Sequence, residues 1–295
     1  MKIKHLPQHH PGLGRSIEHD PRSLRFAAPV LPRSVIKSVQ WQRRIPILDQ
    51  GELGSCTGNA GTGWVGTDNK DRQGLTLVGG KPVDETFAVG LYSLATVLDG
   101  LSGTYPPTDS GSSGLGVAKA LQKDTLCTSY THAFSIDAAY AALQSGPVLL
   151  GIPWYNSMFD PKSDGRVPVD PKSGLAGGHE IVCGQLVVEN GVGTQIWFDN
   201  SWATSWGKEG RGYFIPEDLT TLLADDGDVT CPQAAVVPQP APPLPPSPSP
   251  TPTGSLVMTV NDPGVIAHVN SAAALRKVTD DAWLTHHLQG YFGVA

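Results

Sequence analysis

The 295-residue sequence has no extended run of basic residues. Its longest is the pair Arg43-Arg44, and the formal net charge is -6 at pH 7. Proteins that bind nucleic acid usually carry a basic patch that neutralises phosphates. We therefore expect no nucleic-acid partner.

Long apolar stretches are absent as well. The longest, such as residues 147–154, are far shorter than the roughly 20 residues that span a bilayer, and the opening sequence MKIKH lacks the apolar segment of a signal peptide. We expect a soluble protein with no membrane span and no signal peptide.

Cysteine is scarce and scattered. None of the four residues belongs to a C-x-x-C pair, which excludes a zinc ribbon and a dense disulfide framework. The cysteines are Cys56, Cys127, Cys183 and Cys231. Histidines gather near both chain ends, at His5, His9, His10, His286 and His287. Because no cysteine or carboxylate lies at ligand spacing from them, we expect no metal and no cofactor.

Glycine and proline are plentiful, with 34 and 26 residues, and a hydrophobic content of 39% is sufficient for a core. Residues 1–36 form a predicted extended arm, and 37–232 a single α+β domain. Residues 233–254 form a predicted proline-rich linker, with nine prolines in the 17 residues from 238 to 254. Residues 255–295 are too few to fold readily alone, so we expect them to dock or assemble.

Apolar periodicity divides the domain into a helical first half and a sheet-rich second half. Helices are predicted at residues 56–68, 87–98, 114–122 and 136–144. Strands are predicted at residues 148–152, 180–188, 195–198 and 212–215.

A glycine-rich turn, ILDQGELGSCTGNA at 47–60, precedes a predicted helix that begins at Cys56. Unpaired N–H groups and the macrodipole at a helix start favour a thiolate, which makes Cys56 a candidate nucleophile. The Cys56 N–H and the Gln50 side-chain amide can converge on an oxyanion. A turn with a structural cysteine is equally compatible with this segment.

A glycine pair at 177–178 leads into the predicted strand that begins next to His179. A histidine there can face a cleft and act as general base and then acid. Glu180 suggests an H-E-x-x-H zinc motif, but position 183 is cysteine. A structural histidine is the alternative.

Asn200 begins the segment NSWATSWG. Its side-chain oxygen can accept a hydrogen bond from the second ring N–H of the histidine and fix the tautomer, and Trp202 can keep water from that hydrogen bond. An aromatic-rich core hairpin is the competing interpretation.

Together these segments resemble the cysteine, histidine and asparagine motifs of the papain-like (C1) cysteine peptidases. They occur in the family's order, with His179 and Asn200 following Cys56 by 123 and 144 residues. The resemblance implies a two-lobed α+β fold, with a helical left lobe, an antiparallel β-barrel-like right lobe and the active site in the cleft between them. It also implies catalytic roles for Cys56, His179, Asn200 and Gln50.

Weaker matches extend the resemblance. Ser110 and Gly111 lie in a segment that resembles the one that pairs with substrate backbone, and Trp202 is a further substrate-binding candidate. Thr57 replaces the family's usual aromatic residue, and Ala203 its usual glycine. The sequence also resembles a compact group known from actinobacteria and their bacteriophages, which implies a place in the virion or the bacterial cytoplasm.

The resemblance predicts a cysteine-type endopeptidase that acts on proteins or peptides. Two alternatives stay open: a peptidoglycan-cleaving thiol hydrolase, and a virion or tail structural or adhesion protein that keeps the fold as a scaffold. Residues 255–295 would bind a virion or cell-envelope partner. An arm that crosses the cleft would act as a built-in inhibitor.

Overall fold

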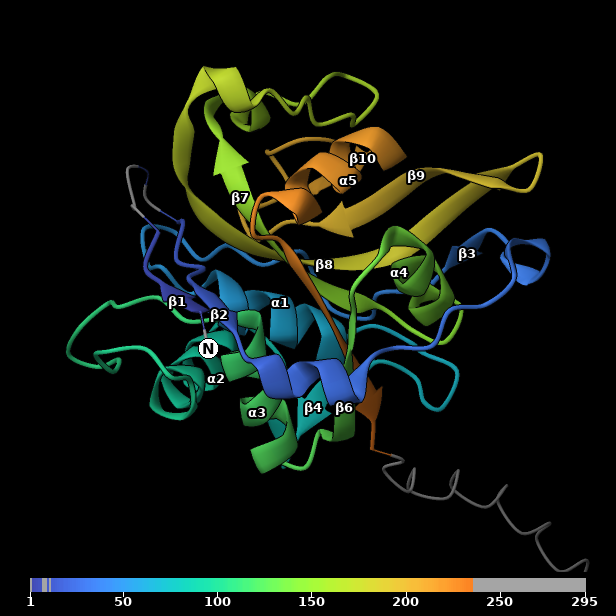
Figure 1. Ribbon diagram of the computed structural model, residues 1–295. Helices are drawn as coiled ribbons and strands as arrows, with labels where there is room; N and C mark the ends of the chain where they lie inside the picture. Colours follow the sequence, from blue (N-terminus) through green and yellow to red (C-terminus); the bar gives the residue numbers. More distant parts are fainter. Residues whose placement is uncertain (1, 7–9, 11, 236–295) are drawn as a thin grey trace, which may run out of the picture. The chain divides into compact units, whose positions relative to one another are not determined.

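The computed structural model describes residues 2–6, 10 and 12–235 (Figure 1). These belong to one compact unit, Met1–Pro238. The predicted segment 255–295 and most of the predicted linker 233–254 lie outside the described residues. Within the described part of the chain, no helix combines the length and apolar character needed to cross a bilayer.

Three helices pack against one another: α1 (Cys56–Val65), α2 (Glu85–Leu98) and α3 (Gly114–Lys123). The side chains of Asp84 and Ser113 cap α2 and α3 by accepting backbone N–H groups, which is why these helices begin there. Small residues line α1, and a Cβ at Gly58 would lie 2.3 Å from the Ala88 carbonyl oxygen. Glycine thus lets α1 and α2 approach closely.

A large antiparallel sheet forms the other half of the unit. In spatial order its strands are β10 (Arg211–Phe214), β9 (Val192–Asp199), β8 (Leu175–Glu189), β7 (Val148–Tyr155), β11 (Asp228–Ala234) and β6 (Cys127–Ala133), with β3 (Val39–Gln40) paired to β8. Strand β7 is buried along its whole length. The pair β4 (Leu77–Val78) and β5 (Lys81–Pro82) forms a separate ribbon.

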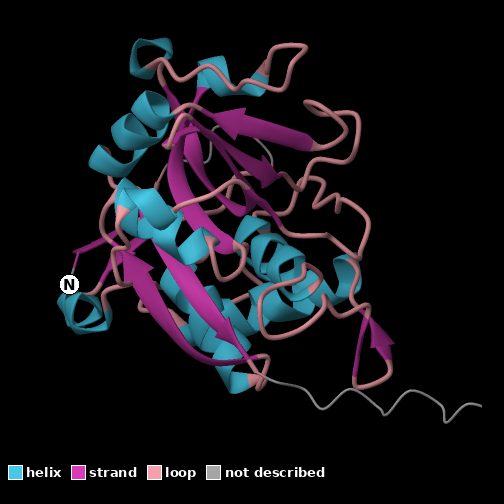
Figure 2. Ribbon diagram, turned by 90° about the vertical axis from the view of Figure 1, so that its right-hand side faces the viewer, coloured by secondary structure: helices cyan, strands magenta, loops and turns pink. Residues whose placement is uncertain are grey.

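The sheet separates two hydrophobic clusters because neighbouring side chains on a strand face opposite ways. Leu149 and Val182 pack with α1–α3, whereas Leu150 and Ile181 pack in the cluster that holds residues of α4 (Ile136–Leu143) and α5 (Pro216–Ala224). Figure 2 shows the long strands running between helical groups. Strand β8 therefore presents alternate residues to the two clusters.

The predicted barrel-like lobe is wrong in one respect, since the sheet is not a closed barrel. Strands β10 and β6 are the two ends of the open order described above. Strand β11 pairs with β7 only through residues 228–230 and then continues along β6. Because β11 leaves β7 in this way, β6 lies against α3. It does not pair with β10, so the sheet stays open.

The predicted arm contains short regular elements. Strands β1 (Lys2–Lys4) and β2 (Ile17–His19) pair antiparallel, and two 3-10 turns follow, η1 (Pro21–Phe26) and η2 (Arg33–Val35). In Figure 1, β1 and β2 lie near α1 and α2, whereas the chain after η1 runs toward β3. Two further 3-10 turns, η3 (Asn156–Phe159) and η4 (Pro171–Ser173), lie between β7 and β8.

Candidate active site

Cys56 is the first residue of α1, as expected. The turn before it is held by Asp109, which accepts the Gly54 N–H at 2.8 Å and the Tyr92 hydroxyl at 2.6 Å. The Cys56 side chain is completely buried. The helix start and the 109–113 segment are thereby fixed to each other.

Burial raises the pKa of the Cys56 thiol to about 12. Backbone N–H groups of Glu180, Gly14 and Thr57 oppose this shift, while the negative charge of Glu180 reinforces it. The cysteine is therefore a neutral thiol in this state, because loss of water outweighs the helix N-terminus and the N–H groups around the sulfur.

His179, the second candidate catalytic residue, lies within β8. Its Nε2 lies 2.7 Å from the Asn200 Oδ1, and its ring stacks on Trp202 with centroids 4.6 Å apart. Trp154 meets the ring edge-on at 5.0 Å. Burial lowers the pKa of His179 to about 4, with the Asn200 hydrogen bond opposing the shift. The ring is therefore neutral.

The tautomer of His179 follows from its partner. The Asn200 Oδ1 also accepts the Ser201 N–H at 2.8 Å, so this atom acts as an acceptor and the His179 Nε2 carries the proton. The His179 Nδ1 is then an unprotonated base, and this buried atom has no hydrogen-bond partner among the described residues. No hydrogen bond between Nδ1 and the Cys56 sulfur is formed in this state.

Asn200 is held at the end of β9. Its N–H donates to the Gly210 carbonyl at 2.9 Å, and Asp199 before it pairs with Arg43 at 3.1 Å and Arg211 at 2.9 Å. These contacts fix the backbone that carries the carboxamide, independently of the histidine. Asn200 and His179 are thus brought together by neighbouring strands β8 and β9.

Gln50 lies next to this pair and is buried. Its N–H donates to the Ser201 carbonyl at 2.9 Å, and its Oε1 accepts the Ser201 hydroxyl at 2.6 Å. The Nε2 donates to the Leu53 carbonyl at 2.7 Å. The amide is therefore occupied by the turn before Cys56, and its role toward an oxyanion stays a prediction.

Residues 12–16 of the arm cross the cleft beside Cys56. The N–H groups of Gly14 and Arg15 donate to the Gly178 carbonyl at 3.1 and 3.0 Å. On the other side, the Ser112 N–H donates to the Gly14 carbonyl at 2.9 Å, and the Ser16 N–H donates to the Ser112 carbonyl at 2.7 Å. The arm backbone therefore bridges the sheet and the helical half.

Two glycines make this crossing possible. A Cβ at Gly14 would lie 1.9 Å from the Gly54 carbonyl oxygen, and one at Gly178 would lie 2.2 Å from the Arg15 carbonyl oxygen. Gly178 lies within β8, which begins at Leu175, so the prediction that the glycine pair precedes the strand is wrong. Glycine inside a strand permits this close backbone approach.

The predicted substrate-binding residues Trp202, Ser110 and Gly111 have different surroundings. Trp202 lies in the cleft, and its Nε1 donates to the Gly12 carbonyl at 3.4 Å. The Gly111 N–H donates to the Tyr92 hydroxyl, and the Ser110 hydroxyl bonds locally to the Gly111 carbonyl. Ser112, which the sequence analysis did not single out, is the residue that pairs with the arm.

All four cysteines are buried and free of disulfides. Within residues 2–6, 10 and 12–235, no cluster of three or more histidine, cysteine, aspartate or glutamate side chains could hold a metal ion.

No protein-family model and no curated protein matches the sequence. Solved structures do match. Xylellain, a cysteine protease from Xylella fastidiosa, aligns with a TM-score of 0.55 and 20% identity, covering 80% of this chain and 98% of xylellain. The fold is papain-like.

Two further structures with this papain-like fold align less closely. Digestive procathepsin L 3 of Tenebrio molitor gives a TM-score of 0.49 at 14% identity and covers 77% of each chain. The bromelain protease from Ananas comosus gives 0.43 at 13% identity, covering 70% of this chain and all of that one. At 20% identity, the likeness to xylellain shows a shared fold alone, so activity has to be argued from the site.

Proposed function

We propose that the chain is a cysteine-type endopeptidase in which Cys56 is the nucleophile and His179 the general base and acid. The observation that carries the proposal is the 2.7 Å His179–Asn200 hydrogen bond, in a papain-like fold whose helix α1 begins at Cys56. That hydrogen bond leaves the His179 Nδ1 as the basic atom.

The chemistry follows from these atoms. The Cys56 thiol transfers its proton to the His179 Nδ1, and the thiolate attacks the carbonyl carbon of the scissile amide. The Cys56 N–H and the Gln50 amide bind the oxyanion. The imidazolium then protonates the leaving amine as the C–N bond breaks and a thioester forms. Water that gives a proton to His179 hydrolyses the thioester and regenerates the thiol.

The arm has to leave the cleft before this cycle begins. With residues 12–16 in place, the sulfur is fully buried and the Cys56 pKa is raised to about 12. Displacement of the arm would admit water and substrate, which lowers the desolvation cost of the thiolate–imidazolium pair. The arm therefore acts as a built-in inhibitor in this proposal.

Casein digestion by the full chain tests the activity. We expect replacement Cys56→Ala to reduce the rate roughly 1,000-fold or more, because the nucleophile is lost. The matched control Cys183→Ala removes another buried thiol and should retain activity. Cleavage of purified cell wall but not casein would favour the peptidoglycan hydrolase instead.

A scaffold role is the second candidate, because the buried sulfur and the missing Cys56–His179 hydrogen bond also fit an inert site. The three matched structures do not bear on the predicted phage association. Deletion of residues 238–295 addresses both. An endopeptidase should keep its casein activity, whereas a virion or envelope component should lose assembly or localisation.

A further inference from the structure

A second buried polar cluster lies next to Cys56 and forms what we term the acid pocket, defined by Glu180, Gly151 and Asp228. These three residues are cross-strand neighbours on β8, β7 and β11, because Gly151 pairs with Glu180 on one side and with Asp228 on the other. Glycine in the middle leaves an open floor between two carboxylates. The sheet itself therefore builds an acidic recess, in which burial and the neighbouring Asp228 raise the pKa of Glu180 and Arg15 opposes that rise.

Arg15 of the arm fills this recess. Its side chain is fully buried, and its Nη2 forms an ion pair with the Asp228 carboxylate and donates to the Asp226 carbonyl at 2.7 Å. A Cβ at Gly151 would lie 2.8 Å from the Arg15 Nε and 2.6 Å from the Glu180 Oε2. The guanidinium thus occupies the volume that any larger residue at 151 would take.

Helix α3 closes the pocket from the opposite side. A Cβ at Gly114, the first residue of α3, would lie 2.7 Å from the Asp228 Oδ1 and 2.9 Å from the Glu180 Oε1. The positive end of the helix dipole therefore faces the two carboxylates. The pocket is enclosed by the sheet and by α3, and its contents reach it along the cleft that holds the arm.

The body of the protein supplies little cationic compensation to this pocket. The Glu180 carboxylate is completely buried, and its oxygens have no hydrogen-bond partner among the described residues. Lys119, on the same helix α3 as Gly114, is occupied by Glu18 and by the Leu98 carbonyl. Because buried carboxylates are costly without a cation, the recess is suited to a positively charged guest.

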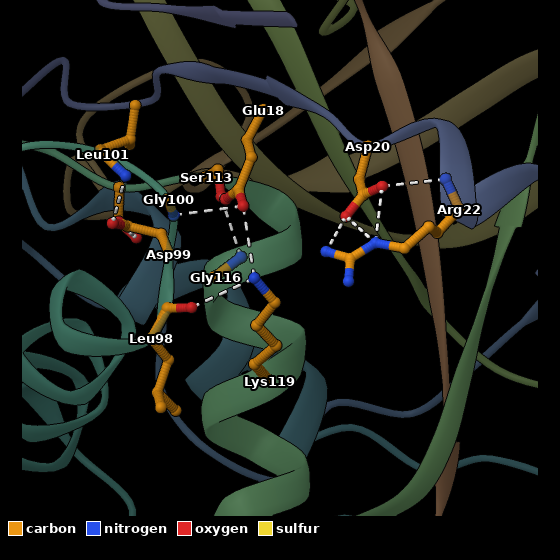
Figure 3. Close-up of polar contacts among 11 residues, drawn as sticks. Glu18, Asp20, Arg22, Leu98, Asp99, Gly100, Leu101, Ser113, Gly116 and Lys119 are labelled. Carbon is orange, nitrogen blue, oxygen red and sulfur yellow. Dashed lines mark hydrogen bonds and ion pairs between the residues drawn. The ribbon is translucent and has the colours of Figure 1, made fainter. Parts of the chain in front are cut away.

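The arm is held in position on the helical side by Glu18, three residues after Arg15 (Figure 3). The Glu18 carboxylate accepts the Ser113 hydroxyl and the Gly100 N–H, the latter at 3.1 Å, and pairs with Lys119 at 3.3 Å. This anchor and the pocket guest belong to one short segment. The arm therefore delivers its arginine to a defined place beside the candidate nucleophile.

We propose that the acid pocket is the specificity pocket of the protease and takes an arginine or lysine side chain of the substrate close to the scissile bond, with Arg15 occupying it in the resting protein. The inference rests on the proposed endopeptidase function and names its substrate class: proteins and peptides with a basic residue at the cleavage site.

The geometry favours arginine over lysine. The Arg15 Nη2 engages the Asp228 carboxylate and the Asp226 carbonyl, while the buried Arg15 Nε and Nη1 and both Glu180 oxygens have no hydrogen-bond partner among the described residues. A guanidinium presents five N–H donors in a plane, whereas an ammonium presents three at one point. Arginine can therefore engage more of these acceptors at once.

Peptides that differ in one side chain test the specificity. Each quenched fluorogenic peptide carries arginine, lysine, citrulline or leucine at one position near the scissile bond. The set covers each of these positions in turn. Citrulline keeps the shape of arginine without its charge. At one position, the full chain is expected to cleave the arginine peptide on the order of 100-fold faster in kcat/KM than the citrulline peptide. Equal rates at every position would overturn the proposal.

Isosteric variants test whether the preference for a charged side chain comes from the acid pocket. Replacements Glu180→Gln and Asp228→Asn remove charge without removing volume, so each should reduce the arginine-to-citrulline ratio at least tenfold while the leucine peptide is still cleaved. The matched control Glu189→Gln changes an exposed glutamate on the same strand and should leave the ratio unchanged. A ratio that persists in both pocket variants would contradict the assignment.

A readout independent of hydrolysis separates this proposal from the proposed function. In the variant Arg15→Ala, iodoacetamide should alkylate Cys56 at least tenfold faster than in the wild type, as followed by peptide mass spectrometry. Argininamide should slow that alkylation, and citrullinamide should not. Arg15→Gln provides a second variant if the first does not fold, and Arg22→Ala, on the exposed part of the arm, is the control.

The pocket proposal and the endopeptidase proposal can fail separately in these experiments. Protection by argininamide without hydrolysis of any peptide would support the pocket and contradict the endopeptidase. Hydrolysis that depends on Cys56, with no charge preference and no selective protection, would support the endopeptidase and overturn the pocket.

Discussion

Two buried polar clusters meet on consecutive residues of β8, and they are completed in different ways. His179 is partnered by Asn200 and covered by Trp202, both from the body of the protein. Glu180, facing the other way, belongs to a recess whose cation comes from the arm. The candidate base is therefore preorganised by the domain itself, whereas the recess is completed by a side chain of the arm. This difference predicts that the two clusters respond separately to mutation.

The largest expected effect is on the free energy of unfolding, and it comes from disrupting the second cluster, around Glu180. Replacement Arg15→Ala leaves Asp228 and Glu180 without their cation, and removing one partner of a buried ion pair typically costs about 3–5 kcal/mol of unfolding free energy. Urea denaturation at pH 7 measures it. The control Arg22→Ala, whose largely exposed side chain pairs with Asp20, should cost much less. Equal costs would mean that the buried position of Arg15 does not matter.

The pH dependence tests the first cluster. The folded-state pKa of His179 is lowered to about 4 from an ordinary value of 6.5, so the unfolded chain binds more protons between these values. Stability attributable to neutral His179 is therefore present above pH 6.5 and is lost as the pH falls toward 4, by roughly 3 kcal/mol from the shift.

Urea denaturation of the wild type and of His179→Gln from pH 7 to pH 4 isolates this contribution. The other titratable groups are the same in both proteins, so their effects largely cancel in the difference. The stability advantage of the wild type over the variant should shrink as the pH falls. A constant difference would place His179 in a more solvated position than the structure gives.

Replacement Asn200→Ala should separate rate from specificity. Losing the partner that fixes the His179 tautomer is expected to reduce kcat/KM about 100-fold for every peptide, because the basic Nδ1 is no longer held in place. The arginine-to-citrulline ratio should stay the same. A changed ratio would show that the two faces of β8 are coupled.

The smallest expected effect concerns Ala203, at the edge of the first cluster. It has φ +58°, a left-handed conformation that costs a non-glycine residue roughly 1 kcal/mol. Replacement Ala203→Gly should raise the melting temperature slightly, provided that the added freedom of the unfolded chain does not offset the relieved strain. Peptide specificity should not change. A lower melting temperature would mean that unfolded-state entropy dominates at this turn.

Local signals explain why several elements were predictable. Asp84 and Ser113 cap their helices, so the starts of α2 and α3 fall within two residues of the predicted ones. The candidate site residues Cys56, His179 and Asn200 were identified because glycine-rich and aromatic motifs surround them. The likeness of the motifs to a known family supplied the papain-like fold, which periodicity alone could not.

Other features depend on contacts between distant residues. Strands β6 and β11 were missed because CTSYTHA is polar at several positions and β11 contains Pro232, which weakens a strand pattern. The acid pocket needs the register that aligns Glu180, Gly151 and Asp228, and no local pattern encodes it. Glu180 drew attention only as part of a zinc motif that the sequence does not complete.

The pairing of β1 with β2 tethers the cleft-crossing segment at both of its ends. A displaced segment stays within reach of its site, where its effective concentration is in the millimolar range typical of short tethers. A competing peptide has to overcome that concentration at every encounter. One cut between the two strands would turn the loop into two tails and remove the constraint that the β1–β2 pairing places on the segment.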